Sequence, residues 1–512
     1  GIGSEFSKEQ FQAALKLGHV NSITVFSKCH HGWAYHPSKA NEMHPGLSFD
    51  LLGAEIEAAH EIGVKTPVYL SAGLDEKMAR RHPEWLRRGD PSDAVGWNRP
   101  GYHEFCMNSP YLDYLLAQIE EVVRNYDCDG IFLDIVGVRT CYCQNCIKTL
   151  LDEGKDPYDD ANIAELGERV YANYTRRVRE TVDKVKPGLP VFHNSGHIRR
   201  GRRDLADVDT HLELESLPTG GWGYDHFPLS AAYSRTLGKD FLGMTGKFHT
   251  TWGEFGGFKH PMALRYEEAL CVANGAKCSV GDQMHPLGKL DEATYALIGE
   301  AYAEVEEKEP WLDHVTSVAD VAILSQEAMS CYYSRSKLIH HQGTAGDTGA
   351  GRILLDDAMA DKVRAFVAKG GKVLASGTSC LSTAKDEFVV DLGAVWKGVS
   401  AFRPVYFRPD FDIGCLRNSA YVIYEQAYDM EAKPDAKVLI HRENPYFNRT
   451  TFTFCSHQHT PNDKTKSYPA ATLGKNGAYV SSEIFAEYAN KGSITTKMML
   501  LGVIEALLAE DK

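Results

Sequence analysis

Short apolar runs alternate with longer segments of helical periodicity over the first 281 residues, and this alternation limits the fold more than any other feature. The expected strands cover residues 22–26, 67–70, 130–134, 190–193, 210–215, 241–245 and 278–281. The expected helices between them cover residues 51–62, 111–126, 163–185 and 263–274. Such alternation is typical of a parallel sheet covered by helices.

Seven strands are one short of a closed (β/α)8 TIM-type barrel, and the first periodic segment, from Ser7 to Gly18, is a helix. We therefore predict an α/β fold with an eight-stranded barrel whose first strand lies upstream of Gly1 or is missing from the chain. The alternative is an open doubly wound sheet, but no Gly-rich phosphate loop follows any strand. Residues 343–351 are Gly-rich without the spacing of a phosphate loop.

The pattern changes after Trp311. Strand-like residues 318–324 and 353–355 are followed by a helix over 358–369, a strand over 372–375 and a last helix over 495–509. We expect a boundary near Pro310, with a catalytic barrel over residues 1–310 and a flavodoxin-like α/β domain over residues 311–512.

A formal net charge of −14 argues against nucleic acid or an anionic membrane surface as a partner, since both select basic patches. The sequence has no apolar run of about 18 residues, so no membrane span is expected. Its first residues have neither the basic start nor the apolar segment of a signal peptide. Twelve cysteines spread over 512 residues are too sparse for a disulfide scaffold. A reduced, cytoplasmic setting is expected.

Residues 126–137 contain a short apolar strand that ends in one carboxylate, Asp134. Because the carboxyl ends of barrel strands open into the active site, Asp134 is a candidate catalytic residue. In a retaining glycosidase one carboxylate attacks the sugar while a second, about 5–5.5 Å away, protonates the leaving oxygen. The alternative is that Asp134 caps a turn or pairs with an arginine.

The second carboxylate is expected at another strand end, and residues 210–224 are the best source. A period of two places His211, Glu213 and Glu215 on one face. Glu215, nearest the strand end, is our candidate acid/base; Glu213 is the runner-up and Glu254 a third candidate. A solvated surface strand could show the same alternation.

Imidazole and aromatic side chains recur at the same ends of the predicted strands, where they could hold a sugar by hydrogen bonds and stacking. A metal site at the adjacent histidines is disfavoured because neighbouring residues point in different directions. Each alone could be structural, but the recurrence predicts a binding site. The candidates are His30, His31, Trp33, Tyr35, His193, Asn194, Glu213, Trp222, Tyr224, Trp252 and Glu254.

Three cysteines, Cys141, Cys143 and Cys146, follow Asp134 within a few residues. Thiolates at this spacing suit tetrahedral zinc, with Cys106 as the natural fourth ligand and Cys128 as second choice. A four-thiolate site would be closed and therefore structural, so no catalytic cofactor is expected. The alternative is four reduced, buried thiols without metal.

Several motifs in residues 1–310 resemble a group of glycoside hydrolases that includes glycoside hydrolase family 151, the α-L-fucosidases. The motifs are Phe26-Ser-Lys-Cys-His-His-Gly-Trp, His44-Pro-Gly-Leu-Ser-Phe-Asp-Leu-Leu-Gly, Cys106-Met-Asn-Ser-Pro, Asp129-Gly-Ile-Phe-Leu-Asp and residues 212–225. By similarity to the α-L-fucosidases of family 29, His30 and His31 would hold fucose and Asp134 would be the nucleophile. The His pair is followed here by Gly-Trp, where family 29 usually has an acid and Gly-Phe, and no shared motif fixes the acid/base.

Residues 318 to about 508 resemble the trimerisation domain of family 42 β-galactosidases, whose zinc cluster the four cysteines also resemble. The resemblance implies a homo-oligomer, most simply a trimer. The predicted function is a retaining exo-glycosidase, an α-L-fucosidase that removes terminal α-L-fucose from oligosaccharides by double displacement. The alternatives are a family 42 type β-galactosidase and a non-catalytic sugar-binding barrel.

Overall fold

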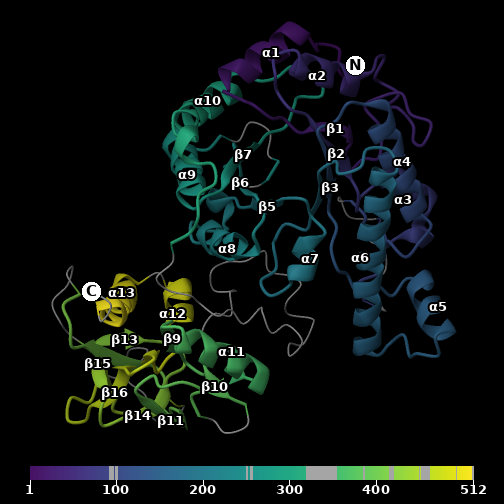
Figure 1. The fold of residues 1–512 in the computed structure, drawn as a ribbon. Helices are drawn as coiled ribbons and strands as arrows, with labels where there is room; N and C mark the ends of the chain where they lie inside the picture. The colour runs from purple at the N-terminus through teal and green to yellow at the C-terminus, as the bar shows by residue number, and fades with distance from the viewer. Residues whose placement is uncertain are drawn as a thin grey trace. The chain divides into compact units, whose positions relative to one another are not determined.

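A computed structural model describes residues 1–90, 97, 102–249, 252–253, 258–318, 354–383, 387–413, 420–448, 450, 462–491 and 493–509. The chain divides into two compact units, Gly1–Thr316 and Ser317–Lys512. Figure 1 colours the chain from its N-terminus to its C-terminus and labels the helices and strands of both units.

The N-terminal unit contains two parallel sheets whose strands lie in chain order. One sheet has four strands, β1 (Val25–Lys28), β2 (Pro67–Ser71), β3 (Gly130–Asp134) and β4 (Val191–Asn194). The other has three, β5 (Leu212–Glu215), β6 (Phe241–Gly246) and β7 (Lys277–Gly281). The sheets meet where the Thr210 backbone nitrogen donates to the Val191 carbonyl oxygen at 3.0 Å. The predicted α/β class with parallel strands is confirmed.

Helices connect and cover these strands; in Figure 1, α4 and α6 lie beside β3, and α9 and α10 lie beside β6 and β7. The α-helices are α1 (Lys8–Leu17), α2 (Leu51–His60), α3 (Glu76–Arg81), α4 (Tyr111–Asn125), α5 (Gln144–Asp152), α6 (Asp160–Asp183), α7 (Arg203–Asp207), α8 (His226–Ser234), α9 (Pro261–Ala273) and α10 (Glu292–Glu306). Short 3₁₀ turns are η1 (Pro83–Trp85), η2 (Pro218–Gly220), η3 (Arg235–Leu237) and η4 (Glu309–Trp311). None of the described helices is long and apolar enough to cross a membrane.

The larger core of this unit fills the space between the four-stranded sheet and its helices. Leu70 and Leu133 from the strands pack with Ile119 of α4 and Val178 of α6, all nearly inaccessible to water. In a strand, successive side chains point to opposite faces. The core therefore fixes which strand residues face away from the helices, and Asp134, next to Leu133, is one of these.

The C-terminal unit is built largely from antiparallel strands among its described residues. A six-stranded sheet has the order β13 (Tyr421–Ile423), β12 (Val405–Pro409), β15 (Lys437–Glu443), β16 (Tyr468–Leu473), β17 (Gly477–Val480) and β9 (Val373–Ser376). Two further pairs are β8 (Leu354–Leu355) with β10 (Leu381–Ser382) and β11 (Ala394–Val399) with β14 (Tyr428–Ala432). The helices are α11 (Asp357–Ala368), α12 (Ile484–Lys491) and α13 (Ile494–Leu508).

This sheet differs from the parallel sheet of a flavodoxin-like fold. Within it, only β17 and β9 pair in parallel. Parallel neighbours need a crossover connection, and α11, between β8 and β9, is the one helix available between described strands of this unit. The predicted strand over residues 318–324 lies, apart from Val318, outside the described residues.

Candidate active site

The register of the four-stranded sheet brings three polar side chains to one end and one face. Ser71 pairs with Asp134, and Asp134 pairs with Asn194, each as the last residue of its strand. The carboxyl ends of parallel strands are where α/β enzymes build their sites.

Asp134 is fixed by its backbone. The Ala72 and Gly73 backbone nitrogens donate to its carbonyl oxygen at 3.1 and 3.0 Å. Ile135, which follows it, has a φ of 59°, a strained value for a β-branched residue. A side chain at position 73 would begin 1.8 Å from the Ile135 carbonyl oxygen, so only glycine allows the two strand ends to lie this close.

Three donors meet the Asp134 carboxylate. The Tyr69 hydroxyl donates to Oδ2 at 2.5 Å, while the Asn194 side-chain nitrogen and the Ile135 backbone nitrogen each donate to Oδ1 at 2.9 Å. The carboxylate thus uses both of its oxygens as hydrogen-bond acceptors.

Asn194 also connects the two candidate catalytic carboxylates. Its Nδ2 lies 2.9 Å from Asp134 Oδ1 and 3.3 Å from Glu215 Oε2. The two oxygens cannot be further apart than the sum of these distances, which is below the separation of about 6.5 Å at which inverting glycosidases begin. One amide nitrogen is therefore within hydrogen-bond distance of both carboxylates.

The surroundings of Glu215 favour a proton on its carboxyl group. Burial raises the pKa of Glu215 to about 7, and the charge of Asp134 adds to the increase. The hydrogen bond from Asn194 acts in the opposite direction, because it stabilises the ionised form. A half-buried carboxyl with such a pKa can donate a proton near neutral pH, as a general acid must.

His30 lies beside this pair with one ring nitrogen engaged. The Ser71 hydroxyl donates to the Leu74 carbonyl oxygen at 2.9 Å, so its oxygen accepts from His30 Nδ1–H at 2.6 Å. Burial lowers the pKa of His30, which favours the neutral ring. His30 Nε2 is then a lone-pair acceptor suited to a sugar hydroxyl.

His31 uses both ring nitrogens within its own loop. The Trp33 backbone nitrogen donates to Nδ1 at 3.0 Å, and Nε2 lies 2.9 Å from the Tyr35 hydroxyl. Burial lowers the pKa of His31 to about 4, so the ring is neutral. The Trp33 ring packs against the Lys77 ammonium, 4.8 Å from the ring centroid. His31, Trp33 and Tyr35 therefore support the loop that carries His30.

His193 lies on the face opposite to Asp134. It pairs with Leu133 in the register, and its Nδ1 lies 3.1 Å from the Tyr174 hydroxyl of α6. Burial lowers its pKa to about 3. The structure thus brings Asn194, but not its neighbour, to the carboxylate pair. Glu213 points to the same face as Glu215, as period two requires, and its Oε1 lies 2.9 Å from His211 Nε2.

The aromatic candidates after β5 and β6 occupy different surroundings. Trp222 packs edge-on against His226, with ring centroids 5.3 Å apart. Tyr224 is exposed, and its hydroxyl donates to Glu267 Oε1 at 3.2 Å. Trp252, also exposed, covers the end of β7, where a side chain at Gly281 would begin 2.7 Å from the indole. Glu254 lies outside the described residues.

Three site residues are absent from the sequence-based candidates. Tyr69 and Ser71 lie on β2 and contact Asp134 and His30, respectively. Tyr102 is exposed and meets the His30 ring edge-on, with centroids 5.3 Å apart. Period two in the strand ending at Ser71 could have indicated the first two; Tyr102 had no local signal.

The four predicted cysteines come together beside this site. Cys106, Cys141, Cys143 and Cys146 are buried, and their sulfur atoms lie within 4.8 Å of one another. Cys106 Sγ and Cys146 Sγ are 3.5 Å apart. Four convergent, buried thiols suit a tetrahedral zinc ion.

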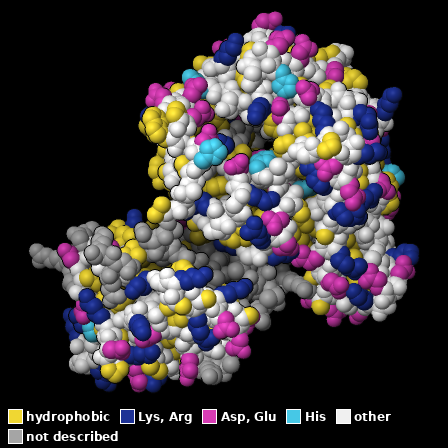
Figure 2. Space-filling view, viewed as in Figure 1, with side chains coloured by type: hydrophobic (Ala, Val, Ile, Leu, Met, Phe, Trp, Pro, Cys, Tyr) yellow, Lys and Arg dark blue, Asp and Glu magenta, His cyan; other side chains and the backbone are white. Residues whose placement is uncertain are grey.

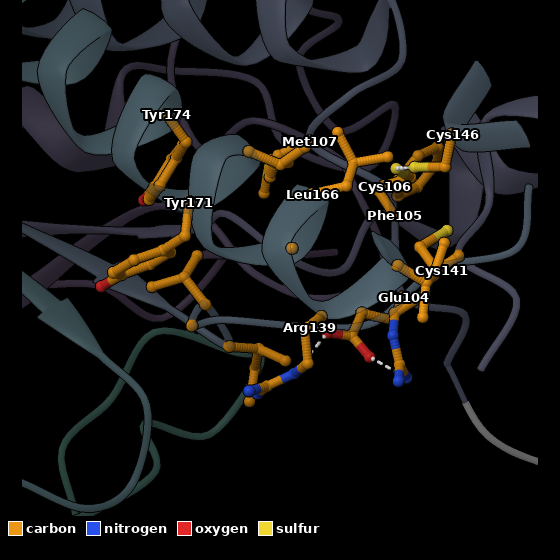
Figure 3. A pocket seen from close by; sticks show the side chains of 17 residues that line it. Glu104, Phe105, Cys106, Met107, Arg139, Cys141, Cys146, Leu166, Tyr171 and Tyr174 are labelled. Atoms are coloured by element: carbon orange, nitrogen blue, oxygen red, sulfur yellow. Dashed lines mark hydrogen bonds and ion pairs between the residues drawn. The ribbon is translucent and has the colours of Figure 1, made fainter. Parts of the chain in front are cut away.

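Cys106, Cys141 and Cys146 line a pocket together with residues of α6, and Leu166 of α6 belongs to the same apolar cluster as the thiols. Figure 3 shows Tyr171 and Tyr174 at one end and the sulfur atoms at the other. At its edge, Arg139 donates to Glu104 at 3.0 Å. Ile135 also lines the pocket, so the same segment contacts the cysteine cluster region and follows the candidate nucleophile.

The visible face of the N-terminal unit carries intermixed basic and acidic side chains (Figure 2). This mixed charge fits a neutral ligand better than a polyanion.

Residues 7–135 match a family model described as hypothetical glycosyl hydrolase 6. α-L-Fucosidase isoenzyme 2 from Paenibacillus thiaminolyticus is 52% identical; the match covers 100% of this chain and 82% of that chain, with a TM-score of 0.93. No curated protein sequence matches the chain.

More distant structures show the same fold. A β-galactosidase from Bacillus circulans sp. alkalophilus has a TM-score of 0.66 at 14% identity, covering 98% of this chain and 86% of that chain. A β-galactosidase from the haloarchaeon Halorubrum lacusprofundi has a TM-score of 0.62 at 15% identity, covering 98% and 89%.

Proposed function

This chain belongs to the glycoside hydrolase family of the Paenibacillus α-L-fucosidase, and on that premise we propose that it is a retaining α-L-fucosidase acting on terminal α-L-fucose of oligosaccharides. The observation that carries the mechanism is the bridge of Asn194 between Asp134 and Glu215. It holds a carboxylate that accepts three hydrogen bonds beside a carboxyl group whose pKa is raised to about 7.

In the first step an Asp134 oxygen attacks the anomeric carbon. The glycosidic C–O bond breaks as Glu215 gives its proton to the leaving oxygen, and a glycosyl ester of Asp134 remains. In the second step Glu215 takes a proton from water, whose oxygen attacks the same carbon and releases Asp134. Two displacements retain the anomeric configuration.

Sugar binding is assigned mainly to groups around the carboxylate pair. His30 Nε2 would accept from a sugar hydroxyl, and the exposed Tyr102 ring beside it offers an apolar face. Trp252 and Tyr224, on the other sheet, are exposed and face the leaving-group side in this assignment. His31, Trp33 and Tyr35 orient the loop of His30.

Four further features belong to the proposal: the barrel, a structural zinc ion, the oligomeric state and the cellular location. The two parallel sheets belong to a (β/α)8 barrel, and the four clustered cysteines hold a structural zinc ion without a role in bond cleavage. The chain forms a trimer, supported by the resemblance of residues 318 to about 508 to the trimerisation domain of family 42 β-galactosidases. The enzyme works in the cytoplasm, supported by the free state of all nine described cysteines.

The decisive assay compares aryl α-L-fucoside with aryl β-D-galactoside, followed by NMR of the first sugar anomer released. We expect hydrolysis of the fucoside with α-L-fucose as the initial product. A faster galactoside reaction would favour the β-galactosidase alternative, and release of the β-anomer would exclude the retaining mechanism. Fucose binding by calorimetry without turnover of any glycoside would indicate a sugar-binding protein.

A further inference from the structure

A second group of metal-ligating side chains lies apart from the four-cysteine cluster and from the carboxylate pair. It consists of Glu268 and Cys271, one turn apart on α9, and Cys278 on β7. The two sulfur atoms and a carboxylate oxygen lie within 4.8 Å of one another. Glycine at position 243 of β6 makes room for this group, because a side chain there would begin 2.3 Å from Cys271 Sγ.

The Glu268 carboxylate has no hydrogen-bond partner within the described part of the chain. The residue is 0% exposed, and both carboxylate oxygens are buried and unpartnered. The nearby Cys278 thiol instead donates to the Glu268 backbone carbonyl oxygen at 3.7 Å. A buried polar group left unpaired destabilises the fold, and more so when it is charged.

The preceding residue shows what a satisfied carboxylate looks like on the same helix. Glu267 accepts from the Thr245 hydroxyl at 2.6 Å, from the Tyr224 hydroxyl at 3.2 Å and from the Lys259 ammonium. Lys259 is thus engaged by Glu267. Glu268 points to a different environment, in which the neighbouring ligand atoms are sulfur.

Two occupants fit neighbouring thiols: a bond between them or a cation. A disulfide would join Cys271 to Cys278 but leave both Glu268 oxygens unpartnered. A thiophilic divalent cation would be bound by all three groups. Because Zn–S bonds are about 2.3 Å long and zinc is tetrahedral, two thiolates on one zinc ion lie about 3.8 Å apart, so sulfur atoms that lie within 4.8 Å of one another would have to approach by at most about 1 Å.

We propose that Glu268, Cys271 and Cys278 form a second, buried site for a thiophilic divalent cation such as Zn²⁺. Binding would release the thiol protons and tie α9 to β7. Glu267 directly precedes Glu268 on α9 and accepts hydrogen bonds from Tyr224 and Thr245. By fixing α9, the ion would therefore also fix the position of the Glu267 carboxylate. This site is independent of the proposed sugar hydrolysis.

The test is metal stoichiometry of the full chain, stripped of metal under reducing conditions and reloaded with Zn²⁺ alone. We expect Cys271→Ala/Cys278→Ala to bind one zinc ion fewer per chain than the wild type, while Cys380→Ala, which removes a buried thiol of the C-terminal unit, binds as many. Equal binding by the wild type and the double variant would overturn the proposal. A Cys271–Cys278 disulfide in the purified wild type, seen by mass spectrometry without reductant, would also overturn it.

Glu268→Gln keeps the side-chain shape and both thiols, so it serves if the double variant does not fold. We expect at least tenfold weaker zinc binding at this site and a weaker thiolate-to-metal charge-transfer band with Co²⁺. Unchanged zinc affinity and an unchanged Co²⁺ spectrum would reject Glu268 as a ligand and with it the site.

Discussion

The four-stranded and three-stranded sheets of the N-terminal unit each supply one carboxylate, and they hold it differently. Asp134, on the first, accepts from three donors that come from β2, β4 and its own loop. Glu215, on the second, is half-buried and accepts from one described side chain, Asn194. The difference teaches that donor count and burial, rather than residue type, divide the roles of nucleophile and acid.

The sharpest test of this contrast removes the ionised member. Asp134→Asn should lower kcat/KM for an aryl α-L-fucoside by more than about 10⁴-fold, because the attacking oxygen is lost. The matched control is Asp127→Asn, whose side chain is 90% exposed and pairs only with Lys186. A variant that keeps a tenth of the activity removes Asp134 from the mechanism.

Replacement of the protonated member should cost less and depend on the leaving group. Glu215→Gln should slow hydrolysis of natural oligosaccharides by about 10²–10⁴-fold, with a smaller loss on activated aryl fucosides that need no proton. Glu213→Gln, two residues away on the same face, is the control for steady-state kinetics on both substrates. An unchanged rate for Glu215→Gln would transfer the role to Glu213 or Glu254.

The contribution of one hydrogen-bond donor to the Asp134 carboxylate can be measured by removing the Tyr69 hydroxyl. Tyr69→Phe removes a hydrogen bond to a charged group, worth about 1.5–3 kcal/mol, so kcat/KM should fall about 10- to 100-fold. Tyr126→Phe removes a tyrosine–carboxylate bond of 2.8 Å to Asp50, outside the site, and should leave kcat/KM near the wild-type value. Equal losses in both variants would mean that the Tyr69 effect is one of stability.

The smallest expected effect is a displacement of the pH profile. As pH rises past about 7, Glu215 loses its proton, and kcat/KM should fall because the deprotonated carboxylate cannot act as general acid. Asn194→Ser removes the donor that stabilises ionised Glu215, so its pKa should rise and the basic limb should move to higher pH. A basic limb that moves to lower pH would contradict the assigned direction of this hydrogen bond.

Much of the fold could be predicted because its signals are local. The run Ile131–Leu133 between glycines indicated β3 with Asp134 at its end, and the alternation of strands and helices indicated the parallel α/β class. The enzyme class is likewise confirmed, through the Paenibacillus α-L-fucosidase.

The errors and omissions have physical causes. Tyr69 looks like a core aromatic in an apolar strand, and only the pairing of β2 with β3 aims its hydroxyl at Asp134. His193 and Asn194 are adjacent, so sequence proximity placed both in the site, whereas the pleat sends the histidine to α6. The C-terminal unit resembled a parallel module because helix and strand propensities do not encode strand direction.

By itself the sequence determined which residue types stand at the strand ends and where four cysteines could converge. Only the tertiary structure decided which carboxylate meets three donors, which meets one, and which side chain links the two. Spacing along the chain fixes the face of a strand to within one residue, but the pKa of a group depends on neighbours that arrive from other strands.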